Sequence, residues 1–118
     1  MNFDDAIRAH LKWKTRLRVY LTSLGSARLD ADLIGNEEEC DLGRWILGQG
    51  VDHRGLPEYE TLKLHHAAFH RVAADIVKTA QADKAAALGL LDDEATFSVL
   101  SEQVVATITA LKAKLASL

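Results

Sequence analysis

The sequence predicts an all-α protein, because two patterns in the chain favour helices over strands. Long stretches carry apolar residues spaced three and four positions apart, which is the spacing of one helix face. No stretch alternates apolar and polar residues for long, and Pro57 is the only proline. We therefore expect an antiparallel four-helix bundle, made of three long helices and one short helix.

The first two helices are expected in the first half of the chain. One runs from about Phe3 to Leu24, where apolar residues follow a single face, and Gly25-Ser26 ends it. The short helix runs from about Glu37 to Leu47, with Asn36 as its cap and three glutamates in its first turn. The connection over residues 25–36 has room for a further turn.

The other two helices are expected in the second half. The third runs from Pro57 to about Ala82, because proline suits the first helical turn and Glu58 and Glu60 complement the helix dipole. The fourth runs from about Asp92 to the end of the chain. Its apolar stripe is formed by Phe97, Leu100, Val104, Ile108, Leu111, Leu115 and Leu118.

The length and composition exclude several classes of protein. A chain of 118 residues suffices for one domain, spanning residues 1–118, and its net charge of −3 comes without a basic stripe for nucleic acid. No apolar run is long enough to span a membrane, and the acidic start of the chain does not resemble a signal peptide. The single cysteine, Cys40, excludes an internal disulfide. We expect a cytoplasmic protein without nucleic-acid or membrane partners.

Histidines interrupt the apolar faces of two predicted helices. His10 lies on the apolar face of the first helix and His66 on that of the third, where an unpaired imidazole would cost about 1–3 kcal/mol. A lone histidine of this kind usually donates to a backbone carbonyl and fills space. However, His70 follows His66 by four residues, and a His-x-x-x-His pair on one helix face can grip zinc at two points. His65 lies about 100° round the helix and is predicted to be a bystander, and His53 a solvated loop residue.

Cys40, near the start of the short helix, completes a possible ligand set. Taken alone, a single cysteine is usually a buried filler and sometimes a nucleophile or a metal ligand. Together, His10, Cys40, His66 and His70 offer four nitrogen and sulfur ligands for a tetrahedral Zn²⁺ site. Such a site carries a charge of +1, which a nearby carboxylate could balance.

A full ligand shell argues against an enzyme, because a catalytic zinc keeps one position open for water. A small metalloenzyme with Cys40 as nucleophile and His66 or His70 as base lacks a residue to orient the base. A di-iron oxygen carrier would need more carboxylates in register with the histidines. We therefore predict that the protein is not an enzyme.

Three segments together resemble the chemoreceptor zinc-binding (CZB) domain family. They are HLKWKTRLRVYL (10–21), CDLGRWILGQG (40–50) and LHHAAFH (64–70). The motif CDLGRW is the specific one, since chance would rarely place it between the other two at fitting distances. The resemblance covers nearly the whole chain, about residues 3–118.

The resemblance implies a four-helix bundle, often a homodimer, with zinc held by His10, Cys40, His66 and His70. It also implies a sensory module of bacterial chemoreceptors or diguanylate cyclases, whose output changes with zinc occupancy or with oxidation of the cysteine by hypochlorous acid. This chain has no methyl-accepting or GGDEF region, so we expect it either to act on such a partner in trans or to be an excised or degenerate copy of the domain. The broad apolar stripe of the fourth helix is the predicted dimer surface.

Overall fold

The computed structural model describes residues 2–22, 31–36 and 40–118, and every regular element among them is helical. This confirms the predicted all-α class. The elements are α1 (Phe3–Thr22), α2 (Ala31–Gly35), α3 (Asp41–Leu47), the 3₁₀ helix η2 (Gln49–His53), α4 (Pro57–Ala82), α5 (Lys84–Gly89) and α6 (Thr96–Ala116).

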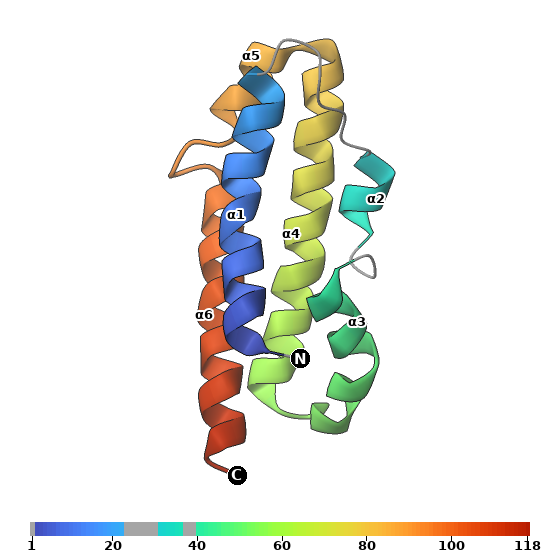
Figure 1. Ribbon diagram of the computed structural model, residues 1–118, viewed down its shortest axis with the longest axis vertical. Coiled ribbons are helices and arrows are strands. Elements are labelled where there is room, and N and C mark those ends of the chain that lie inside the picture. Colours follow the sequence, from blue (N-terminus) through green and yellow to red (C-terminus); the bar gives the residue numbers. More distant parts are fainter. Residues whose placement is uncertain (1, 23–30, 37–39) are drawn as a thin grey trace.

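Three long helices form the body of an elongated molecule of 49 × 26 × 20 Å. Figure 1 shows α1 and α4 running in the same direction, with α6 antiparallel to both. The short helices α2 and α3 follow one another back along α4, and α5 lies at the far end, between α4 and α6. The chain thus returns from the end of α1 to the start of α4 along one side of α4.

The apolar core lies between the long helices and follows the predicted helix faces. Phe69 of α4 stacks on Phe97 of α6, with ring centroids 5.1 Å apart. The largest fully buried apolar side chains are Phe69, Phe97, Leu17, Leu42, Ile46, Leu62, Ile76, Leu91, Ile108 and Leu111. These residues come from α1, α3, α4 and α6 and from the turn before α6, so a single core connects these four helices.

Several predicted elements are confirmed. Helix α4 has the predicted bounds, Pro57 stands in its first turn, and Glu58 and Glu60 lie in that turn. Helix α1 begins at Phe3 as predicted, while its predicted end at Leu24 lies outside the described residues. The further turn expected within residues 25–36 is α2.

The start of the short helix was predicted wrongly. Helix α3 begins at Asp41, and Cys40 is its N-cap in an extended conformation (φ −114°, ψ 147°). The Cys40 Sγ accepts a hydrogen bond from the Gly43 N–H at 3.4 Å, so a thiol takes the capping role predicted for Asn36. The glutamates at positions 37–39 lie outside the described residues.

The last of the four predicted helices, α6, also begins later than predicted, at Thr96 rather than Asp92. Residues 92–95 form a turn in which the Ala95 N–H donates to the Asp92 carbonyl, and Lys14 of α1 pairs with Asp93 at 2.5 Å. The sequence analysis missed two short elements, η2 and α5. Helix α5 is capped by Asp83, whose carboxylate accepts from the Ala86 N–H.

The apolar stripe of α6 is mostly used inside the chain. Phe97, Val104, Ile108 and Leu111 are buried, and only Leu118 of the predicted stripe is fully exposed. The homodimer therefore stays a prediction, and this stripe is not the free surface that the sequence suggested. None of the described helices combines the length and hydropathy needed to cross a membrane.

The core contact between α4 and α6 can be tested with Phe97→Ala. The substitution removes a ring that is 1 % exposed and leaves a cavity, so we expect the free energy of unfolding to fall by about 3–5 kcal/mol. The measurement is urea unfolding of the metal-free protein. Val99→Ala on the same helix, at a side chain 41 % exposed, should cost less than about 1 kcal/mol.

Candidate metal centre

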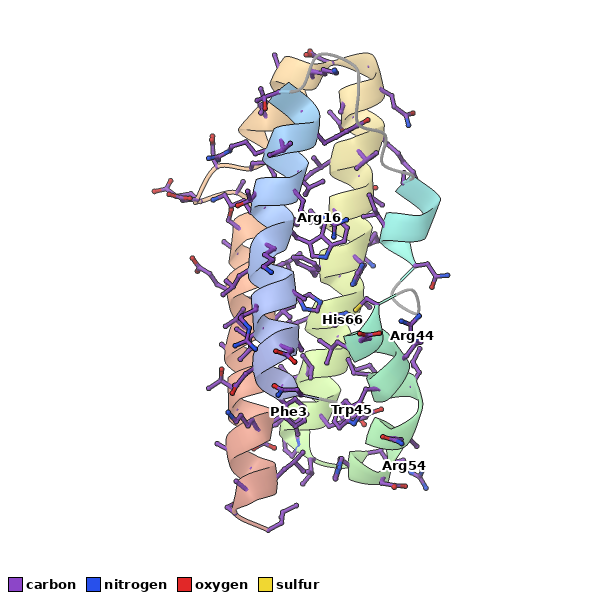
Figure 2. The ribbon with its side chains drawn as sticks, viewed as in Figure 1. Phe3, Arg16, Arg44, Trp45, Arg54 and His66 are labelled. Atoms are coloured by element: carbon purple, nitrogen blue, oxygen red, sulfur yellow. The ribbon has the colours of Figure 1, made fainter. Side chains whose placement is uncertain are left out.

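Three separate segments bring His10, Cys40, His66 and His70 to one place. His10 comes from the first half of α1, Cys40 from the N-cap of α3, and the other two from the middle of α4. One ligand atom from each side chain lies within 4.8 Å of all the others. Figure 2 shows His66 facing from α4 toward the start of α3. The structure thus brings together all four residues that the sequence predicts as ligands.

The distances between these atoms fit a small tetrahedral ion. The Cys40 Sγ lies 3.2 Å from the His66 Nε2 and 3.9 Å from the His10 Nε2. The His66 and His70 Nε2 atoms are 3.1 Å apart. Zinc bonds of ordinary length in a tetrahedron would separate two nitrogens by about 3.3 Å and a nitrogen from a sulfur by about 3.6 Å. These three distances differ from the tetrahedral values by no more than about 0.4 Å, and the remaining pairs lie within 4.8 Å.

Backbone carbonyls orient two of the imidazoles. The His10 Nδ1–H donates to the Ala6 carbonyl at 2.7 Å, and the His70 Nδ1–H donates to the Ile34 carbonyl of α2 at 2.7 Å. Donation from Nδ1 leaves the lone pair of a neutral imidazole on Nε2, and in both residues Nε2 faces the cluster. These bonds fix the tautomer that a metal at the centre requires.

Aromatic rings enclose the cluster on one side. The Phe69 ring meets His10 and His70 edge to face, at centroid distances of 5.3 and 5.5 Å. The Trp13 ring approaches His70 at 6.5 Å. With His10 and His70 2 % exposed and His66 fully buried, the imidazoles lie in a region of low polarity.

Burial keeps the histidines neutral. Desolvation is the main cause that lowers the pKa of His66 to about 2, and the neighbouring His70 and His10 lower it further. Desolvation also lowers the pKa values of His10 and His70, with their hydrogen bonds to carbonyls acting in the opposite direction. Neutral imidazole is the form that binds metal, so the site is prepared for a cation at neutral pH.

The cysteine is the most accessible of the four residues. Cys40 is half-buried, and burial raises the pKa of its thiol, although the backbone amides of Gly43 and Leu42 partly offset this. A cleft of about 790 Å³ between α1 and the start of α3 is lined by Cys40 and His10. The metal-free thiol therefore stays protonated at neutral pH while remaining reachable from this cleft.

The other two histidines lie outside the cluster. His65 is half-buried on α4 and contributes no atom to the group of four, as predicted from its angle on the helix. His53 is not the solvated loop residue that was predicted. It ends η2 and stacks on the Trp45 ring, with centroids 6.0 Å apart, because the 3₁₀ turn folds back beneath α3.

The cluster contains no carboxylate among the described residues. Among the described residues, the acidic residue next to the cluster along the chain is Asp41, which is exposed and pairs with Arg44 at 2.6 Å. The carboxylate expected to balance a zinc charge of +1 is thus not identified in the described part of the chain. The donor set itself, three nitrogens and one sulfur, is typical of a zinc site with a complete protein shell.

The described structure is helical, with four potential metal ligands clustered in its interior. A family model described as the chemoreceptor zinc-binding domain matches residues 10–77, which include all four cluster residues. The chain belongs to this family, which is a regulatory zinc-binding family rather than a catalytic one. Comparisons with curated proteins and with solved structures give no match.

The protonation states predict that metal binding releases protons. Because the Cys40 pKa is raised, the thiol is protonated at pH 7.5 and must lose its proton to become a ligand, whereas the neutral imidazoles lose none. We expect about one proton released per zinc bound, and an apparent affinity that falls about tenfold for each pH unit lowered near neutrality. Calorimetric titration in buffers of different ionisation enthalpy measures this number. Release near zero would contradict the assigned thiol.

Proposed function

We propose that residues 1–118 form a single chemoreceptor zinc-binding domain in which His10, Cys40, His66 and His70 hold Zn²⁺. The observation that carries this proposal is the convergence of their four ligand atoms, within 4.8 Å, in the interior of the described structure. Three of the four side chains are buried. The family match over residues 10–77 supports zinc as the ion.

The role of the ion in this proposal is structural and regulatory. A complete protein shell leaves no position for a metal-activated water, and bound zinc supplies cross-links between chain segments. The ligands come from α1, the N-cap of α3 and α4, and the His70 Nδ1 also holds the Ile34 carbonyl of α2. Occupancy would thus change how firmly the α2–α3 segment is held on the long helices.

We further propose that this packing change is the signal. In this proposal, α1, α4, α6 and the α2–α3 segment together are the predicted four-helix bundle, and the domain acts as a homodimer. Its partner, in trans, is a chemoreceptor or a diguanylate cyclase, in a reducing cytoplasm where Cys40 stays a thiol. A ligand that binds only the packed form stabilises it by RT ln(1 + [L]/Kd), or about 2.7 kcal/mol at one hundred times Kd.

Two neighbouring histidines provide a matched test of the site. His66→Ala removes a ligand in the centre of the cluster, so we expect the reconstituted protein to retain less than about a tenth of an equivalent of zinc. His65→Ala removes the adjacent imidazole, which lies outside the cluster, and should keep one equivalent. Zinc is measured by atomic absorption after gel filtration, with circular dichroism to confirm folding. Equal zinc in the two variants, or none in the wild type, would refute the proposed site.

A second candidate function, oxidant sensing at the same centre, is favoured by the cleft that reaches Cys40. The Cys40 thiolate that would hold zinc is a nucleophile toward hypochlorous acid, and its oxidation would follow RS⁻ + HOCl → RSOH + Cl⁻, in which sulfur is oxidised and chlorine reduced. The sulfenic acid is a weaker ligand than the thiolate, so zinc would be loosened. Zinc level and oxidant are then two stimuli read by one set of residues.

Oxidation can be followed directly because Cys40 is the only cysteine. We expect stoichiometric hypochlorous acid to oxidise Cys40 and to release zinc in parallel. Mass spectrometry reports the modification, and a chromogenic chelator reports the metal. An unmodified Cys40 with zinc still bound would count against oxidant sensing while leaving the zinc-responsive function intact.

A further inference from the structure

Helix α3 carries the only sulfur ligand and is too short to hold its own position. Its seven residues, Asp41–Leu47, are fewer than an isolated helix needs for stability in water. Cys40 caps this helix and accepts a hydrogen bond from the Gly43 N–H, so the sulfur moves with the first turn. The placement of Cys40 against the histidines therefore depends on what anchors α3 to the rest of the protein.

One polar anchor lies at the opposite end of α3 from the cysteine. The Tyr59 hydroxyl of α4 donates to the Ile46 carbonyl at 2.5 Å. This carbonyl belongs to the last turn of α3, where carbonyls have no partner within their own helix. The Tyr59 side chain is 2 % exposed, so water does not readily replace its hydroxyl.

The two polar contacts between α3 and α4 are separated by similar distances along the two helices. On α3, the six residue steps from Cys40 to Ile46 correspond to about 9 Å of helix, and on α4 the seven steps from Tyr59 to His66 correspond to about 10.5 Å. Cys40 meets His66 at one end, with Sγ and Nε2 3.2 Å apart, and Ile46 meets Tyr59 at the other. Helix α3 thus lies antiparallel along α4 and is attached at both ends.

We infer that Tyr59 is a positioning residue for the metal centre, because its hydroxyl fixes the far end of α3 and thereby holds Cys40 in register with His66. This inference rests on the proposed function, in which Cys40 is a zinc ligand. Tyr59 lies two turns before His66 on the same face of α4, so it contacts neither the metal nor its ligands. It acts through the helix that carries the ligand.

Apolar contacts alone fix α3 less completely. Leu42 and Ile46 are buried in the core, and the Trp45 ring meets Phe3 of α1 edge to face at 5.2 Å. Figure 2 shows Trp45 and Phe3 together near the N-terminal end of α1. These contacts keep α3 on the body of the protein without the Tyr59 hydroxyl, but they are non-directional and tolerate small sliding along α4. The directional hydrogen bond sets the register of the helix.

The test compares Tyr59→Phe with Tyr20→Phe, the same change at the other tyrosine of the chain. Each removes one hydroxyl and keeps the ring, and Tyr20 lies near the far end of α1, away from α3. We expect zinc transfer from Tyr59→Phe to a competing chelator to be about tenfold faster than from the wild type, and from Tyr20→Phe to be unchanged. Both variants should bind one equivalent of zinc.

A second measurement follows the cysteine itself. We expect Cys40 in zinc-loaded Tyr59→Phe to be alkylated by N-ethylmaleimide about tenfold faster than in the wild type, and the thiolate-to-metal charge-transfer band of the cobalt-substituted variant to be weaker or shifted. If Tyr59 had only a structural role, Tyr59→Phe would lower the thermal stability and leave the charge-transfer band of the cobalt-substituted protein unchanged.

Equal chelator transfer, alkylation and spectra in the two variants would overturn the inference, as would a general loss of helicity in Tyr59→Phe. Failure of the wild type to bind zinc would instead overturn the proposed function. The two failures are therefore distinguishable.

Discussion

The structure depends on one constraint, which is that four polar side chains from distant segments share a single buried point. A buried imidazole is costly unless both of its nitrogens have partners. His10 and His70 meet this condition by donating from Nδ1 to carbonyls and turning Nε2 toward the cluster. A histidine on an apolar face can therefore bond a backbone carbonyl through one nitrogen and offer the other nitrogen to a metal. The hydrogen bond made by Nδ1 orients Nε2 toward the cluster.

The sequence predicted most where local chemistry and periodicity agree. Helix α4 was predicted at its full length because proline, two glutamates and a regular apolar face all point to the same start and stripe. The cluster of four residues was predictable because His66 and His70 share one face of that helix and each of the other two segments offers a single candidate, His10 and Cys40. Resemblance to the family and reasoning from residue types selected the same four residues.

The sequence predicted least where a long-range contact overrides a local preference. Asn36 is the better capping residue by propensity, yet Cys40 caps α3, because the sulfur must sit beside His66 of α4. Two further contacts hold α3 against its neighbours: His53 of η2 stacks on Trp45, and the Tyr59 hydroxyl of α4 bonds the Ile46 carbonyl. No pattern in a single sequence predicts either contact.

The energetics divide the protein into two parts with different dependence on the metal. Helices α1, α4 and α6 share an apolar core, exemplified by the Phe69–Phe97 stack, which is stabilised by apolar burial rather than by metal ligation. Helices α2 and α3 are short, and their directional anchors among the described residues include the His70–Ile34 bond, the Tyr59–Ile46 bond and the Cys40 contacts. Two of these three anchors involve proposed zinc ligands. If the cluster holds zinc as proposed, binding would chiefly stabilise the α2–α3 segment, so this segment is the part of the fold best placed to report occupancy.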